Sequence, residues 1–182
     1  MKYNIYNAGS LFTEAEVRQR LFEEDLVNEI AEELGIADKI QFFNPISNPF
    51  NDKSKIPTAE EIYEGDMRQI EMSKNFIFNL DNPLDGGVIA ELFAVIKDIR
   101  YGAKYNIVVV MSDMRIDGAG NYEAHRVPIG HNQFVIGALM QHNIPIFKTS
   151  REAIEHLLLT ISESEAGIRQ YKGAPELSIQ YK

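Results

Sequence analysis

Strand-like and helix-like segments alternate five times along this chain. The predicted strands cover residues 3–8, 39–44, 75–80, 106–111 and 144–147, and the predicted helices cover 13–35, 58–73, 88–101, 132–142 and 150–162. Alternation of this kind favours one parallel sheet with helices on both faces. The almost wholly apolar run Asn106–Met111 (NIVVVM) is typical of a strand covered on both sides. The sequence therefore predicts an α/β fold with three layers and a five-stranded parallel sheet.

The chain length and the helix-capping patterns indicate the extent of the domain and where its first two helices begin. With 182 residues the chain fits a single domain. Capping-box patterns at Thr13–Glu16 and Thr58–Glu61 mark two helix starts, and Gly35 is a plausible helix end. We expect the domain to cover residues 1–162. The polar tail, residues 163–182, could be ordered by packing on a neighbouring subunit.

Charge and composition narrow the classes of partner. The formal charge of −9 argues against polymeric nucleic acid, whose phosphates would be repelled. The chain has no cysteine, which excludes disulfides, thiolate metal sites and a cysteine nucleophile. Its N-terminus lacks the apolar core of a signal peptide, and no run approaches the roughly 18–20 apolar residues of a membrane span. We expect a cytoplasmic protein without a membrane partner.

The predicted topology restricts where a ligand can bind. In parallel α/β sheets, ligands lie beyond the carboxyl ends of the strands. The segments at that edge are residues 7–12, 44–57, 81–91 and 112–132. Candidate site residues should therefore come from these four segments, or from a helix that packs beside them.

Two carboxylates flank the turn after the third predicted strand. Glu91 lies within a very apolar helical run, VIAELFAVI, where a carboxylate must be paired or face a pocket. The alternative is that Glu91 lies on the solvent-exposed side of an amphipathic helix. Asp85 precedes Gly86-Gly87, a pair that allows close approach of a ligand. A simple helix N-cap is an equally good explanation of Asp85.

A third carboxylate, Asp66, follows Gly65 inside a predicted helix. A glycine in mid-helix costs about 1 kcal/mol relative to alanine, which suggests that something approaches the helix closely there. The alternative is a surface aspartate that pairs with Arg68 or Lys74. Two or three converging acids would suit glycosidic chemistry, because one can attack the anomeric carbon while another handles the leaving-group proton.

The sequence lacks the usual motifs of metal-dependent, nucleotide-dependent and serine-hydrolase chemistry. The four histidines show no metal-ligand spacing, so no metal site is expected. The phosphate-binding patterns G-x-x-x-x-G-K-[ST] and G-x-G-x-x-G are missing from the sequence, as is the G-x-S-x-G elbow of serine hydrolases. ATP-dependent, NAD-dependent and serine-hydrolase functions therefore lose their main sequence evidence.

Four segments together resemble the nucleoside 2-deoxyribosyltransferase family. They are Ile5–Thr13 (IYNAGSLFT, similar to an AG-x-x-F opening), Gly65-Asp66 in a helix before a strand, Asp85-Gly86-Gly87 followed by Glu91, and Asn132–Gly137 (NQFVIG). The resemblance covers roughly residues 3–148. Each segment is a weak signal alone, whereas their joint order and their spacing to the strands are fairly specific.

The resemblance implies a role for each matching residue. Glu91 would be the nucleophile on C1′ of deoxyribose, Tyr6 would orient its carboxylate, and Asp66 would protonate the leaving base. Asp85 would lie near the base and sugar. The other implied substrate contacts are Gly9 and Phe12 in the first segment, Phe134, and Asn132 reaching a neighbouring subunit's site. An ordinary strand tyrosine and a helix cap are the alternatives for Tyr6 and Asn132.

The resemblance also implies a flavodoxin-like sheet, no metal or organic cofactor, and a homo-oligomer with shared sites, built from dimers and often a hexamer. Its substrates would be deoxynucleosides and free nucleobases. The loop at 43–49 lacks the base-reading glutamine that the resemblance implies, and the candidates to replace it are Asn44, Ser47 and Asn48. Base preference stays open.

Two rival functions use the same fold. A 2-deoxynucleoside 5′-monophosphate N-glycosidase would pass the sugar to water, but it needs phosphate ligands where this chain has Leu11 and Phe12 beside Ser10. A non-catalytic nucleotide-binding domain would keep the fold and leave Glu91 without a reactive partner.

Overall fold

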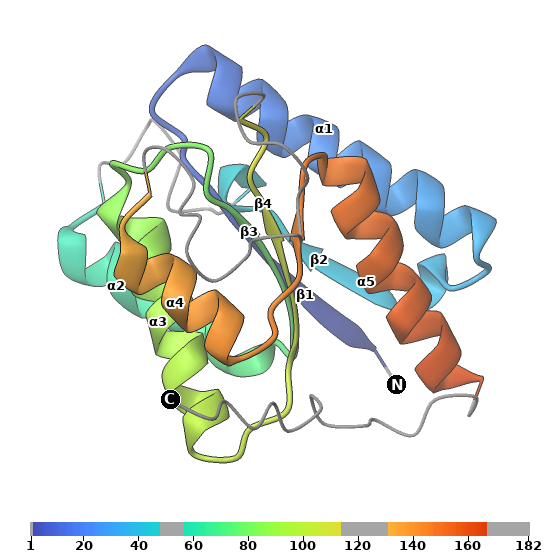
Figure 1. Cartoon of the computed structure of the whole chain (residues 1–182). Coiled ribbons are helices and arrows are strands. Elements are labelled where there is room, and N and C mark those ends of the chain that lie inside the picture. The colour runs from blue at the N-terminus through green and yellow to red at the C-terminus, as the bar shows by residue number, and fades with distance from the viewer. Residues whose placement is uncertain (1, 48–56, 114–130, 167–182) are drawn as a thin grey trace, which may run out of the picture.

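The five strands form one all-parallel sheet in the order β2-β1-β3-β4-β5. The computed structural model describes residues 2–47, 57–113 and 131–166. The strands are β1 (Tyr3–Ala8), β2 (Ile40–Phe43), β3 (Asn75–Asn79), β4 (Asn106–Val110) and β5 (Ile146–Phe147). This strand order is that of flavodoxin-like folds, which confirms the predicted fold class (Figure 1).

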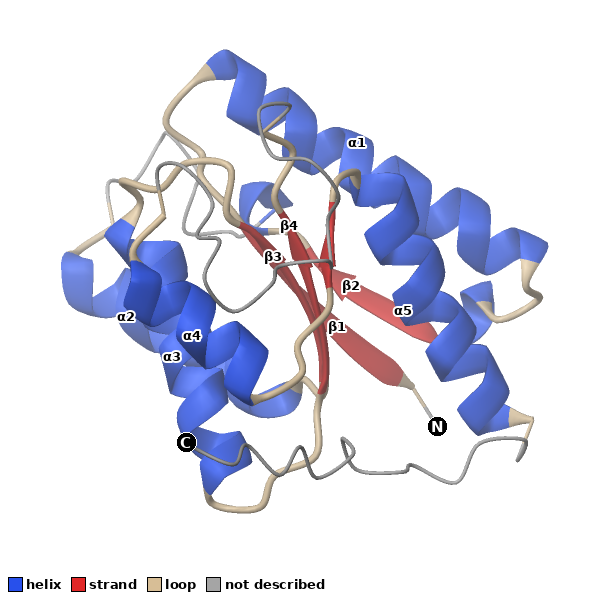
Figure 2. Ribbon diagram, in the orientation of Figure 1, coloured by secondary structure: helices blue, strands red, loops and turns tan. Residues whose placement is uncertain are grey.

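Helices cover both faces of the sheet and complete the three layers. They are α1 (Glu14–Glu33), α2 (Ala59–Met72), α3 (Gly86–Arg100), α4 (Gln133–Gln141) and α5 (Ser150–Glu165), with short 3-10 turns at Ala37–Lys39 and Pro45–Ser47. Figure 2 shows α1 and α5 on one side of the sheet and α2, α3 and α4 on the other. Both predicted capping boxes are formed, at Thr13 and at Thr58.

Each face of the sheet has its own apolar core, because successive strand residues point to opposite sides. On β3, Phe76 and Phe78 pack toward α3 and α4, and Ile77 packs toward α1 and α5. On β1, Ile5 joins the α1–α5 side, while Tyr6 joins the α2–α4 side. The next residue, Asn7, is fully buried. Strand β1 therefore places two neighbouring polar side chains on opposite faces of the sheet.

Most predicted element boundaries differ by one or two residues from those observed, and two of the differences have a clear physical cause. The last helix runs to Glu165 and not to Ser162, because the Glu165 carboxylate accepts a hydrogen bond from Tyr3 Oη and pairs with Lys39 Nζ at 2.8 Å. The last strand begins at Ile146, because the Ile144 amide donates to the Leu139 carbonyl and closes the end of α4. The rest of the predicted tail, residues 167–182, lies outside the described residues.

The buried face of α1 is also unexpected. Leu21 and Phe22 fit the apolar pattern of this helix, yet both are exposed. Arg20 and Glu23 are buried in their place, beside Leu26 and Val27. Within the three described stretches, no helix combines the length and apolar character needed to cross a membrane.

Two adjacent leucines on α5 test the assignment of the core. Leu158 is fully buried, whereas Leu159 is 47% exposed. We expect Leu158→Ala to lower the free energy of unfolding by about 2–5 kcal/mol, because it leaves a cavity between α5 and the sheet. Leu159→Ala should lower it by less than about 1 kcal/mol. Urea denaturation of both variants measures the difference, and equal losses would contradict this packing.

Candidate active site

Tyr6 and Glu91 meet across the α2–α4 face of the sheet. The Tyr6 hydroxyl donates a hydrogen bond to Glu91 Oε1 at 3.0 Å. Tyr6 is buried on β1, and its ring stacks on Phe43 from the end of β2, with centroids 5.3 Å apart. Burial, followed by the charges of Glu91 and Asp66, raises the pKa of Tyr6 well above its usual range, so the phenol keeps its proton. The expected contact of Tyr6 with the Glu91 carboxylate is present, and no other described residue donates a hydrogen bond to this carboxylate.

Glu91 titrates near neutrality. It lies in the second turn of α3, and its pKa is raised from 4.5 to about 7. Burial is the largest cause, and the nearby charges of Asp66 and Asp85 add to it, while the hydrogen bond from Tyr6 acts in the opposite direction. The predicted alternative, a glutamate on a solvated helix face, does not describe this partly buried, hydrogen-bonded carboxylate.

Asp66 faces the same site from α2. The side chain is partly buried, and burial raises the pKa of its carboxyl. Its charge acts on both Tyr6 and Glu91. Gly65, the preceding residue, is buried in the helix. The alternative pairing of Asp66 with Arg68 or Lys74 is not found among the described residues.

Asp85 is the N-cap of α3. Its Oδ1 accepts hydrogen bonds from the amides of Gly87 (2.9 Å) and Val88 (3.4 Å), and its Oδ2 accepts one from Ser10 Oγ at 2.7 Å. A Cβ at position 87 would lie 3.1 Å from Asp85 Oδ1, a tight contact that the glycine avoids. Asp85 therefore acts as a helix N-cap, which was the alternative explanation offered by the sequence. A contact between Asp85 and the substrate stays a prediction. Sequence reasoning missed its partner, Ser10.

Asn132 likewise caps α4. Its Oδ1 accepts a hydrogen bond from the Phe134 amide at 2.9 Å. Phe134 is 72% exposed and stacks on Phe93 of α3, with ring centroids 5.2 Å apart. Contacts of Asn132 and Phe134 with a substrate or with a second subunit stay predictions.

Of the other predicted contact residues, Gly9 and Phe12 are in place at the carboxyl edge, and Phe12 is exposed. Asn48 lies outside the described residues. Asn44 is buried: its Nδ2 donates to the Arg20 carbonyl and to Glu24, and its Oδ1 accepts from the Ile46 amide. Asn44 is therefore committed to the protein itself, which argues against it as the residue that reads the base.

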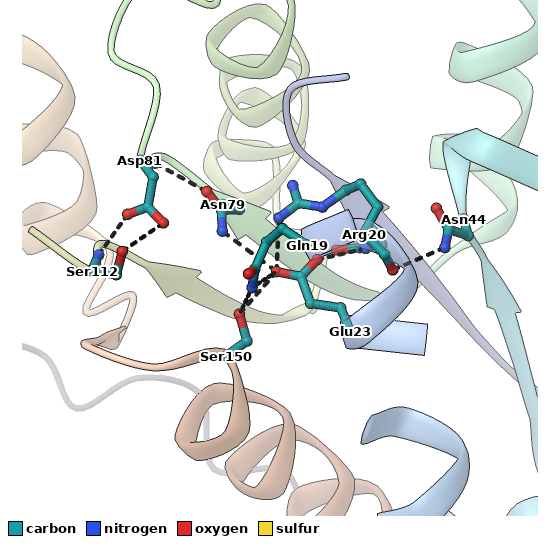
Figure 3. A network of polar contacts seen from close by, with 9 residues as sticks. Gln19, Arg20, Glu23, Asn44, Asn79, Asp81, Ser112 and Ser150 are labelled. Carbon is teal, nitrogen blue, oxygen red and sulfur yellow. Dashed lines mark hydrogen bonds and ion pairs between the residues drawn. The ribbon is translucent and has the colours of Figure 1, made fainter. Parts of the chain in front are cut away.

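A buried polar network on the opposite face was not predicted. Figure 3 shows the carboxylate of Glu23 surrounded by donors from several elements. These donors are Arg20 Nη2 (2.8 Å), Asn7 Nδ2 (2.9 Å), Ser150 Oγ (2.9 Å), Gln19 Nε2 (3.3 Å) and Asn79 Nδ2 (3.4 Å). We call this group the Glu23 network. Most residues of α1 are polar, so its sequence pattern did not distinguish Arg20 and Glu23 from solvent-exposed charges.

The arrangement is suited to acid–base and nucleophilic chemistry. Tyr6 of β1, Asp66 of α2, and Asp85 and Glu91 at the start of α3 come close enough for electrostatic interaction at the carboxyl edge of the sheet. A carboxylate with a pKa of about 7 is available both as a nucleophile and as an acid near neutral pH. In the part of the chain that the structure describes, no three His, Asp or Glu side chains are grouped to hold a metal ion.

Comparisons with known proteins place the fold in context. No protein-family model matches the chain. The chain is 27% identical, over 168 residues, to an uncharacterized protein of Ureaplasma parvum serovar 3, with 89% of this chain and 98% of that protein covered. Among solved structures, a conserved protein from Enterococcus faecalis V583 is similar, with a TM-score of 0.66, 20% identity and coverage of 88% and 99%.

A second solved structure, the 2-deoxyribosyltransferase of Bacillus psychrosaccharolyticus, has a TM-score of 0.51 and 17% identity, with 84% of this chain and 90% of that chain covered. At these identities the likeness establishes a common fold. It also gives a distant structural resemblance to a deoxyribosyltransferase.

The electrostatics of Glu91 can be tested directly. Because the Tyr6 hydroxyl stabilises the ionised form of Glu91, Tyr6→Phe should raise the pKa of this carboxyl above about 7. Asp66→Asn should lower it, because a neighbouring negative charge is removed. Carbon-13 NMR titration of glutamate carboxyls, with Glu91→Gln for assignment, measures both shifts. Shifts in the opposite directions would contradict the contacts described for Glu91.

Proposed function

We propose that this protein is a nucleoside 2-deoxyribosyltransferase, which moves 2-deoxyribose between nucleobases through a covalent glutamyl intermediate on Glu91. The observation that carries the proposal is the convergence of Tyr6, Glu91 and Asp66 at the carboxyl edge, with Glu91 titrating near pH 7. The fold likeness to a 2-deoxyribosyltransferase and the resemblance of the four sequence segments support the same reaction.

The first half-reaction would transfer deoxyribose to the protein. Tyr6 holds Oε1 of Glu91, so Oε2 is the oxygen that attacks C1′. The bond from C1′ to the base nitrogen breaks as the new C1′–O bond forms. Asp66 donates a proton to the departing base, and its raised pKa makes the protonated acid more available near neutral pH.

The second half-reaction reverses these roles. A nitrogen of the incoming base attacks C1′, Glu91 leaves as a carboxylate, and Asp66 takes up the proton that the base loses. Two displacements at C1′ retain the configuration of the sugar. If water attacks in place of a base, the same intermediate gives slow hydrolysis to free deoxyribose.

Two contacts favour nucleosides over nucleoside 5′-monophosphates. A phosphate would need donors in the turn that follows β1. Ser10 Oγ already donates to Asp85, and the guanidinium of Arg20 pairs with Glu23. Both groups are buried, and the acids of the site would repel a phosphate dianion. The monophosphate N-glycosidase therefore remains the weaker alternative.

An exchange assay tests the proposed function. Purified protein is mixed with thymidine or deoxyinosine and free adenine, and chromatography follows the formation of deoxyadenosine. We expect Glu91→Ala to reduce transfer by about a thousandfold or more, because the nucleophile is lost. Asp66→Asn should slow transfer by about a hundredfold without unfolding the protein. Glu155→Ala serves as the control, because Glu155 is a partly exposed residue of α5 on the other side of the sheet.

Each result of this assay has a separate meaning. Deoxyadenosine formation by the wild type, with loss in Glu91→Ala, supports the transferase, and varying the donor maps base preference. Free base and deoxyribose alone would indicate a hydrolase, and monophosphates are then the next donors. No turnover with any donor would favour a nucleotide-binding domain, and near-normal rates in Glu91→Ala would show that Glu91 is not the nucleophile.

We also propose that the protein assembles into a homo-oligomer through α4. The outward side of this helix carries Phe134, Gly137 and Met140, which we call the α4 face. Phe134 is largely exposed, and a Cβ at Gly137 would meet no atom within 4 Å. An exposed apolar face with an open glycine suits close packing against a second copy. Such packing would bring Asn132, at the start of α4, toward the neighbouring subunit.

Sedimentation velocity tests this assembly. We expect the wild type to sediment as an oligomer, and Phe134→Asp combined with Met140→Lys to sediment as a smaller species, because charges would have to be buried at the interface. Leu159→Lys on α5 introduces a charge at another exposed apolar site and should leave the assembly intact. A monomeric wild type, or unchanged mass in the double variant, would refute the proposed interface.

A further inference from the structure

An ion pair is buried outside the candidate site. Arg20 Nη2 lies 2.8 Å from Glu23 Oε1, and the two side chains are 2% and 0% exposed. Arg20 Nε is buried and has no hydrogen-bond partner among the described residues. Replacing a buried ion pair with apolar residues is often neutral or stabilising. Stability alone is therefore a poor explanation for these charges, and their other contacts need consideration.

The guanidinium of Arg20 lies directly against the turn that follows β1. A Cβ at Gly9 would lie only 1.1 Å from Arg20 Nη1 and 2.4 Å from Cζ, so only glycine leaves room for this side chain. The arginine is held in place from the other side, because Glu23 also accepts from Asn7 of β1 and Ser150 of α5. Its position is thus fixed relative to the carboxyl edge of the sheet.

The same turn is connected through hydrogen bonds to the helix that carries Glu91, the proposed nucleophile. Ser10, which follows Gly9, donates to Asp85 Oδ2, and Asp85 Oδ1 caps α3 through the amides of Gly87 and Val88. Glu91 lies about one turn beyond these amides on the same helix. A continuous set of contacts therefore runs from the ion pair, through the turn and the helix cap, to the carboxylate proposed to attack C1′.

We propose that Arg20 and Glu23 are positioning residues for the transfer reaction, which fix the Gly9-Ser10 turn so that Ser10 holds Asp85 and the N-terminus of α3 in register with Tyr6. This role rests on the proposed function for its catalytic consequence. Its structural part, the dependence of the Glu91 environment on Arg20, holds for any ligand of the site.

Arg20→Lys and Gly9→Ala test the proposal. Lysine keeps the positive charge and loses the planar guanidinium that contacts the turn. The added methyl of Gly9→Ala displaces the guanidinium without changing any charge. Both variants should lower kcat by about ten- to a hundredfold, since misplacement by about 1 Å can cost that much, while KM changes little. Arg18→Lys is the matched control, because Arg18 is an exposed arginine on the same helix, paired with Glu14.

A second readout does not depend on activity. Burial, Tyr6, Asp66 and Asp85 together set the pKa of Glu91, so displacement of Asp85 must move it. Carbon-13 NMR titration should therefore show a changed Glu91 pKa in Arg20→Lys and in Gly9→Ala, and an unchanged one in Arg18→Lys. The acid limb of the kcat/KM profile, which reports ionisations of the free enzyme, should move in the same direction.

The outcomes separate the two proposals. A purely structural ion pair would lower the Tm of Arg20→Lys and leave both kcat at 25 °C and the Glu91 titration unchanged, which would overturn the positioning role. If Arg20→Lys does not fold, Gly9→Ala decides by the same criteria. If the wild type transfers no deoxyribose, the proposed function fails, and the Glu91 titration still decides whether Arg20 positions the site.

Discussion

The alternation of side chains along β1 is the constraint on which the rest of this site depends. Tyr6 and Asn7 are neighbours in the sequence, and each is hydrogen-bonded to a carboxylate on a different face of the sheet. Tyr6 holds Glu91 on the α2–α4 side, and Asn7 contacts Glu23 on the α1–α5 side. Since β1 is paired on both edges, with β2 and β3, neither side chain can shift without disturbing the sheet.

The carboxylates of Glu23 and Glu91 differ in their hydrogen-bond partners and in the charges around them. Glu23 is surrounded by donors, including one guanidinium, so its buried oxygens are well supplied with hydrogen bonds. Among the described residues, Tyr6 alone donates a hydrogen bond to Glu91, which also faces the charges of Asp66 and Asp85. The hydrogen bond from Tyr6 does not offset the cost of burying the charge of Glu91, so the pKa of this carboxyl is raised toward neutrality. Such a group costs stability, and this is common where a site needs a reactive side chain.

The helix cap of α3 links the energetics of folding to the chemistry of the site. Asp85 satisfies amides at the N-terminus of α3, where a negative charge is favoured, and the same charge raises the pKa of Glu91. Ser10 completes the arrangement from the turn after β1. The fold by itself does not specify this function, since many activities share flavodoxin-like sheets. The chemical argument rests on which side chains these turns bring together.

The sequence alone determined the α/β class, the five parallel strands and both capping boxes, because hydrophobic periodicity and local capping act over a few residues. Topology limits sites to the carboxyl edge and thereby indicated Asp85 and Glu91. Gly65 in mid-helix drew attention to Asp66, and the family resemblance indicated Tyr6. Only the tertiary structure decided that Tyr6 bonds Glu91, that Asp85 is shared between a helix cap and Ser10, and that Asn44 is occupied. It also showed that Arg20 and Glu23 are buried while Leu21 and Phe22 are exposed. These features depend on contacts between residues 16 to 127 positions apart, and pairings over such distances leave no periodic signal in one sequence.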